Sequence, residues 1–168
     1  MELSALEAAA ILEEGQGEVD RLTAGVPDDE AVRRHAIGGG EWSLKDLIGH
    51  LAPWEELALE TISRTRADGS ITRIALDDVD AENARDIARK AEWPIATVRK
   101  GAAATHEQLV ADLREMADDE WRTPRPVAGG GERTLGDMLG SVLGAPGRPF
   151  GHAWAHLQEL KDYVSSLP

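Results

Sequence analysis

Residues 42–56 read WSLKDLIGHLAPWEE, and this stretch begins the most regular helical pattern in the chain. Ser43 is a suitable N-cap, and Asp46 lies in the first turn, where a carboxylate interacts favourably with the helix dipole. Apolar side chains then recur every three or four residues as far as Ile62. Pro53 lies inside this pattern and predicts a kink or a local break. The pattern therefore predicts a long amphipathic helix over about residues 43–65.

Two further long helices are expected on either side of this one. The first covers about residues 4–24, where Ser4 and Glu7 have the spacing of a capping box. Another covers residues 94–116, with a proline in its first turn, where the missing N–H costs nothing. Its apolar side chains again recur at three-four spacing, which predicts one face buried in a core.

The C-terminal part of the chain predicts a fourth helix that is interrupted. Helical periodicity covers residues 134–142, stops at GAPGRP over residues 144–149, and resumes over residues 150–167. A short polar helix is expected over residues 77–90. No strand-like alternation persists anywhere in the sequence, and no internal repeat is visible. We therefore expect an all-α protein, a four-helix bundle with a short extra helix between helices two and three, as a single domain over residues 1–168.

Composition excludes several classes of protein. The chain has 168 residues, and 18 Lys and Arg against 31 Asp and Glu give a formal charge of −13. This acidic balance argues against binding of nucleic acid or of anionic lipid, because both need a basic surface. There is no cysteine, so thiolate metal sites and cysteine nucleophiles are excluded. No apolar run approaches the roughly 20 residues of a membrane span, and the N-terminus does not resemble a signal peptide, so a cytoplasmic protein is expected.

Three histidines are candidates for a metal site. His152 and His156 are four positions apart, so on one helix they project from the same face, one turn apart. On a helical wheel Tyr163 falls between them, which points that face at the bundle interior. His50 lies at the flank of the apolar face of the 43–65 helix and is the candidate third ligand. Three neutral imidazoles leave a divalent ion an open position, as in catalytic sites. The alternative is that all three are structural or solvated side chains.

The motifs so far resemble those of one known family. WSLKDLIGHLAPWEE is similar to the second-helix signature of the DinB/YfiT-like superfamily, which includes mycothiol-dependent maleylpyruvate isomerases and ClbS/DfsB-like proteins. The resemblance continues in order along nearly the whole chain. Its further matches are Asn83 in DVDAENARD, THEQLVADLREMADDEW at 105–121, RTLGDMLGSVLG at 133–144 and GHAWAHLQEL at 151–160. The break at 144–149 departs from the family pattern.

This resemblance implies a metal site and a class of chemistry. It implies that His50, His152 and His156 bind one divalent ion, zinc or nickel. It also implies a transferase or isomerase that uses a low-molecular-weight thiol such as mycothiol or bacillithiol on a small electrophilic molecule. Because the chain has no cysteine, the thiol would be a co-substrate. The alternatives are a ClbS/DfsB-like hydrolase of a small molecule and a non-catalytic ligand-binding bundle.

Four other side chains are candidates for the substrate pocket. Trp54, one turn after His50, is expected either to form a pocket wall or to pack in the core. His106 lies on an apolar helix face and either lines the same cavity or is a core histidine bonded to a neighbour. Arg148 could meet an anionic substrate group, and Tyr163 could donate a hydrogen bond to a bound group or simply pack in the bundle. A homodimer is compatible with such a bundle, although no exposed stripe establishes it.

Overall fold

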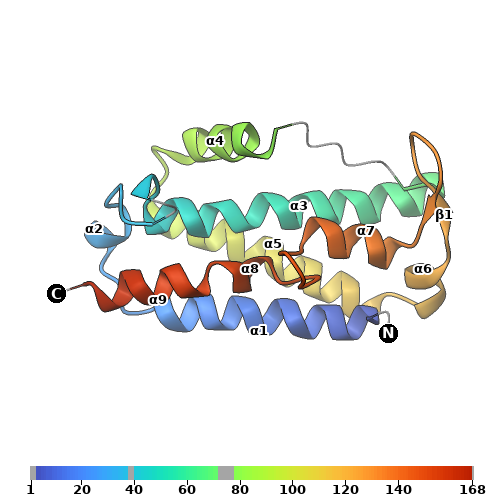
Figure 1. Cartoon of the computed structure of the whole chain (residues 1–168), viewed down its shortest axis with the longest axis horizontal. Coiled ribbons are helices and arrows are strands. Elements are labelled where there is room, and N and C mark those ends of the chain that lie inside the picture. Colours follow the sequence, from blue (N-terminus) through green and yellow to red (C-terminus); the bar gives the residue numbers. More distant parts are fainter. Residues whose placement is uncertain (1–2, 38–39, 72–77, 168) are drawn as a thin grey trace.

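The structure is a computed structural model that describes residues 3–37, 40–71 and 78–167. It is a helical bundle, and the prediction of an all-α four-helix bundle is confirmed (Figure 1). The first three members are single long helices, and the fourth consists of three consecutive shorter ones. Their bounds are α1 (Ala5–Thr23), α3 (Leu44–Asp68), α5 (Ile95–Glu115), and then α7 (Leu135–Val142), α8 (His152–Ala155) and α9 (Leu157–Ser165).

The helices begin where the capping residues predict. Ser4 and Ser43 both form complete capping boxes, with Glu7 and Asp46 respectively, and Thr134 accepts a hydrogen bond from the backbone of residue 137. Each of these side chains satisfies an N–H group that the first helical turn would leave without a partner. Local side-chain chemistry thus sets where α1, α3 and α7 begin.

Helix α3 continues through its proline. It is one helix of 25 residues with Pro53 inside it, so of the predicted kink or local break, the local break is absent. The neighbouring helices account for this, because α3 packs against α4, α5 and α7. Such tertiary packing compensates for a proline that would weaken an isolated helix.

The smaller elements lie at the ends and on one outer side of the bundle. Helix α4 (Val79–Lys90) is the extra helix predicted between the second and third long helices, and it packs on the outer side of α3 (Figure 1). Its predicted start at Asp77 lies outside the described residues. The remaining elements are α2 (Asp28–Ala31), α6 (Asp118–Arg122), β1 (Arg125–Pro126) and β2 (Glu132–Arg133). The two strands form an antiparallel hairpin that was not predicted, since two residues are too few to show an alternating pattern.

The fourth member of the bundle is divided into more helices than expected. The predicted interruption over residues 144–149 is present between α7 and α8, and the helical periodicity predicted over residues 150–167 corresponds to two consecutive helices. This segment is divided at His156, which ends α8 and precedes α9. Helices α8 and α9 both pack on α1, so this fourth member remains part of the bundle despite its divisions. Within the described ranges, no helix combines the length and apolar character needed to cross a membrane.

Candidate metal centre

Three histidines from the second and fourth members of the bundle converge at one point. His50 comes from α3, His152 begins α8, and His156 lies between α8 and α9. The Nε2 atoms of His50 and His152 are 3.1 Å apart. One ring nitrogen of each residue can be chosen so that all three atoms lie within 4.8 Å of one another. Three nitrogen atoms this close together can bind a single metal ion.

The interruption before α8 does not move His152 away from His50. Ala145 and Arg148 exchange backbone hydrogen bonds in a tight turn, and the backbone N–H of His152 donates to the carbonyl of Leu143 at 3.0 Å. Phe150 has a φ of 57°, a conformation uncommon for a residue with a side chain, and its ring is buried. The turn therefore returns the chain to the bundle and starts α8 directly beside the end of α7.

The environment keeps two of the imidazoles neutral. Burial and the proximity of His156 lower the pKa of His50 to about 4, although the side chain of Asn83, as an acceptor for the protonated ring, raises it. Burial and the other two histidines lower the pKa of His152 to about 3. Both rings are therefore uncharged at neutral pH. Neutral imidazole is the form that binds metal, so the site favours cation binding.

Two polar side chains orient these rings from outside. The side chain of Asn83 in α4 lies beside His50 and raises the pKa of its ring, and the Nδ1 atom of His156 lies 2.5 Å from a carboxylate oxygen of Glu159. Metal-binding histidines are commonly held through their second nitrogen in this way. Glu159 was not predicted from the sequence, although its position three residues after His156 on a helix was a usable signal.

Two hollows adjoin the histidine cluster. The first, the α4 pocket, has a volume of about 400 Å³ and lies between α3 and α4. Its described lining residues are His50, Pro53, Trp54, Leu57, Glu82, Asn83, Arg85, Asp86 and Arg89. The second, the α7 pocket, has about 440 Å³ and is lined by Trp54, Val79, Arg133, Met138, Ser141, Val142, Gly144 and His152. Trp54 borders both hollows, so a small molecule can approach the histidines from either side of this ring.

Aromatic rings and paired charges form the walls of the α4 pocket. The ring of Trp54 lies 5.8 Å from that of His152, and Pro53 and Leu57 line the same side of the pocket. On α4, Arg85 pairs with Glu82 and Arg89 pairs with Asp86. The pocket therefore combines an apolar wall on α3 with a charged wall on α4.

Of the four predicted pocket residues, only Trp54 lies beside the cluster. His106 is buried and its Nδ1 atom lies 2.8 Å from Glu55, so it is a core histidine bonded to a neighbour. The guanidinium of Arg148 stacks 3.8 Å from the ring of Trp154. Tyr163 donates its hydroxyl hydrogen bond to the carbonyl of Glu30, 2.9 Å away. The described residues that line the α4 pocket and the α7 pocket do not include His106, Arg148 or Tyr163.

A family model adds independent information. The model of the DinB superfamily matches residues 11–160 of the sequence. The chain belongs to the DinB superfamily. The expected resemblance is thus confirmed over most of the chain, including all three histidines of the cluster. A search of curated proteins found no significant match.

Solved structures share the fold at low sequence identity. An uncharacterised protein of Escherichia coli UTI89 is 15% identical with a TM-score of 0.75, and the alignment covers 96% of this chain and 93% of that one. The colibactin self-resistance protein ClbS, crystallised with double-stranded DNA, is 13% identical with a TM-score of 0.75 and 98% coverage of both chains. A mycothiol-dependent maleylpyruvate isomerase is 18% identical with a TM-score of 0.57, and the alignment covers 98% of this chain but 61% of the isomerase.

The ClbS complex bears on one expectation from the sequence. Because a protein of this fold binds DNA, the fold does not exclude a nucleic-acid partner. The expectation that this chain binds none therefore rests on its formal charge of −13 alone.

Proposed function

We propose that this protein binds one divalent metal ion, zinc or nickel, and uses it in a thiol-dependent transfer or isomerisation of a small electrophilic molecule. The observation that carries the proposal is the convergence of His50, His152 and His156 beside two hollows. A divalent ion held there would supply Lewis-acid chemistry that lowers the pKa of a thiol or of water.

The donor set fits such an ion. His50 and His152 have lowered pKa values and are neutral at neutral pH, so no proton must be removed from them before binding. Glu159 holds the ring of His156 in place, and Asn83 lies beside the ring of His50. Three protein ligands leave coordination positions for substrate, as catalytic sites require.

The surrounding residues position the reactants. Trp54 presents a flat apolar surface that borders both hollows, next to His50 in one and His152 in the other. On the α4 side, Arg85 and Arg89 are cations that can interact with an acidic group of a thiol co-substrate or of the electrophile. The chain has no cysteine, so the nucleophilic sulfur comes from the co-substrate. In a transfer, the sulfur bonds to the electrophilic carbon as the bond to the leaving group breaks, and the thiol proton leaves with that group. In an isomerisation, the sulfur adds to the electrophilic carbon, is expelled again after the rearrangement, and recovers its proton as free thiol.

The first experiment measures metal content and thiol consumption. Tag-free wild-type protein and the variant His152→Ala are analysed for metal by mass spectrometry. The control is His35→Ala, which removes an exposed histidine outside the cluster. We expect about one zinc or nickel per chain in wild type and in His35→Ala, and none in His152→Ala. The same proteins are then incubated with a low-molecular-weight thiol and small electrophiles such as an aryl halide, an epoxide and an unsaturated keto acid.

The outcomes separate the three functions. Thiol consumption that stops on chelation supports the proposal. Conversion of an electrophile without thiol would instead indicate a hydrolase, and recovery of an unchanged bound ligand would indicate a binding protein. Absence of metal after reconstitution with zinc and with nickel would overturn the metal-dependent mechanism.

A further inference from the structure

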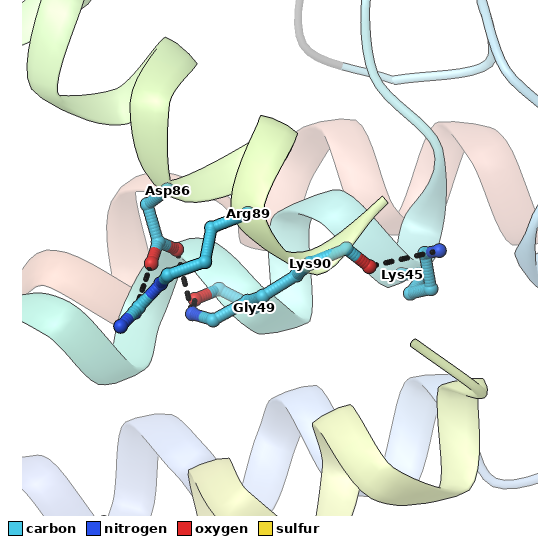
Figure 2. Close-up of polar contacts among 5 residues, drawn as sticks. All are labelled: Lys45, Gly49, Asp86, Arg89 and Lys90. Atoms are coloured by element: carbon cyan, nitrogen blue, oxygen red, sulfur yellow. Dashed lines mark hydrogen bonds and ion pairs between the residues drawn. The ribbon is translucent and has the colours of Figure 1, made fainter. Parts of the chain in front are cut away.

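Helix α4 forms one wall of the α4 pocket but buries little apolar surface. Its only buried residues are Ile87 and Lys90. Among the long helices it packs mainly on α3. A helix that buries so few apolar groups needs other contacts to stay in one position. The contacts that join α4 to α3 are centred on two lysines, Lys45 and Lys90 (Figure 2).

Lys90 donates to a carbonyl that α3 itself cannot satisfy. In an α-helix the carbonyl of Gly49 accepts a hydrogen bond from the N–H of residue 53. Residue 53 is proline and has no N–H. The Nζ atom of Lys90 donates to the carbonyl of Gly49 at 2.7 Å and to Asp86 at 2.6 Å. Lys90 therefore supplies from α4 the donor that Pro53 removes from α3.

Gly49 provides the space that this contact needs. A Cβ atom at position 49 would lie 3.3 Å from Cδ of Lys90 and 3.3 Å from Cγ1 of Val98. The lysine side chain therefore lies directly across the surface of the glycine. Any side chain at position 49 would press on the stem that brings the ammonium group to the carbonyl.

A second lysine makes the reciprocal contact. Lys45 in α3 donates to the carbonyls of Lys90, Ala91 and Trp93 at 3.4, 2.6 and 3.3 Å. These carbonyls lie at and just beyond the C-terminal end of α4, where helical partners are missing and a cation is favourable. Each helix thus satisfies backbone carbonyls of the other through a buried lysine.

The same face of α4 reaches the histidine cluster. Asn83, Asp86 and Lys90 follow one another at three and four positions and so share one face of the helix. Lys90 donates to the carbonyl of Gly49, the residue before His50, and Asn83 lies beside His50 in the α4 pocket. The position of α4 along α3 therefore sets both the Asn83 contact and the width of the pocket.

We propose that Lys90 is a positioning residue, which replaces the N–H group missing at Pro53 and thereby holds α4 with Asn83 against His50. Its effect on metal affinity rests on the function proposed above. The contact between the two helices does not, and it is tested on metal-free protein.

The test is a double-mutant cycle between Lys90→Met and Pro53→Ala. Methionine keeps the length of the side chain without its donor, and alanine returns an N–H group that can bond to the Gly49 carbonyl. Hydrogen exchange of the α4 backbone amides is measured in metal-free protein for the wild type, both single variants and the double variant. Lys100→Met, at an exposed lysine of α5, is the matched control.

We expect Lys90→Met to reduce the protection of α4 about tenfold, because docking then leaves a buried carbonyl without a donor. In the Pro53→Ala background the same change should reduce it less than about threefold, because the backbone N–H of the introduced alanine supplies the donor. Equal reductions in both backgrounds, or none, would overturn the proposal. Because α4 lies outside the bundle, far-UV circular dichroism should show the variants folded.

Zinc affinity, measured by competition with a chromophoric chelator, tests the link to the cluster. We expect Lys90→Met to raise the Kd about tenfold, which is the smaller end of the range seen when a metal ligand loses the residue that orients it. Adding Pro53→Ala to Lys90→Met should restore most of the lost affinity. Lys100→Met should leave the Kd unchanged. Tight zinc binding that Lys90→Met does not weaken would overturn the positioning role. If wild type bound no zinc, the proposed function would fail, and the exchange cycle would still decide whether Lys90 replaces the missing donor.

Discussion

The Nε2 atoms of His50 and His152 lie 3.1 Å apart, although 102 positions separate these residues in the chain. Burial holds the pKa of both rings well below neutrality, at about 4 and about 3. At this distance one neutral ring can donate its Nε2–H to the bare Nε2 atom of the other, and the same two nitrogen atoms are close enough to bind one cation in place of that proton. With His156 they form a cluster of three nitrogen atoms.

Metal binding should stabilise the fold. A ligand that binds only the folded state raises the free energy of unfolding by about 2.7 kcal/mol at one hundred times its Kd. We expect this increase for wild type in urea unfolding with zinc compared with chelator. His152→Ala should show no increase, whereas His35→Ala should behave as wild type. An equal increase in His152→Ala would place the zinc elsewhere.

Glu159 should matter for affinity more than its exposure suggests. Its carboxylate lies 2.5 Å from Nδ1 of His156, and an orienting carboxylate of this kind typically contributes tenfold or more to metal affinity. We expect Glu159→Gln to raise the zinc Kd about tenfold in chelator competition. Glu56→Gln, at an exposed glutamate of α3, is the control and should have no effect. Equal Kd values for the two variants would show that Glu159 does not orient the ligand.

The buried pair of His106 and Glu55 should make stability depend on pH. Burial lowers the pKa of His106, but the hydrogen bond and charge of Glu55 outweigh it, and the net pKa is raised above 6.5. A raised pKa means that the folded state holds a proton that the unfolded state releases first. The resulting stabilisation is complete below about pH 6.5 and is lost as pH rises through the pKa of the folded state.

This dependence can be isolated by comparing wild type with His106→Gln in chelator. The difference in unfolding free energy between the two proteins should be larger at about pH 6 than at about pH 9. Urea unfolding at several pH values measures it. A difference that grows with rising pH would mean that burial dominates and that His106 is neutral in the folded protein.

Glycine 49 should respond to substitution differently from glycine 101. Replacing a glycine inside a helix by alanine normally stabilises it by up to about 1 kcal/mol. At Gly101 in α5 a Cβ atom would meet no atom of the described structure within 4 Å, so Gly101→Ala should gain this amount. At Gly49 the new atom would press on Lys90 and Val98, so Gly49→Ala should gain less or lose stability. If urea unfolding gave the two variants equal increases in the free energy of unfolding, the Lys90 contact would tolerate a Cβ atom at position 49 without loss of stability.

Much of the local structure could be predicted from the residues alone. The capping boxes at Ser4 and Ser43 and the start of α7 at Thr134 depend only on side chains within three positions of the backbone groups that they bind. The division at His156 and the unbroken course of α3 through Pro53 could not be predicted in this way. Both depend on which neighbouring helices press on the backbone at that point.

For the candidate pocket residues the sequence offered alternative roles but could not choose between them. Three of these residues carry groups that could bind a ligand, but each contacts another part of the protein. His106 contacts Glu55, Arg148 stacks on Trp154, and Tyr163 donates to the carbonyl of Glu30. Which partner a side chain meets depends on the rotation and depth of its helix in the bundle. Spacing along one helix does not contain that information.

By itself the sequence determined the helical class, the helix starts and the acidic charge. Periodicity and caps depend on residues close together in the chain, and net charge depends on composition alone. The sequence also placed His152 and His156 about one helical turn apart. Only the tertiary structure brought His50 to them and set α4 over the pocket through Lys45 and Lys90. Those contacts join segments tens of residues apart, and they form only when the packing of the whole bundle positions the helices relative to one another.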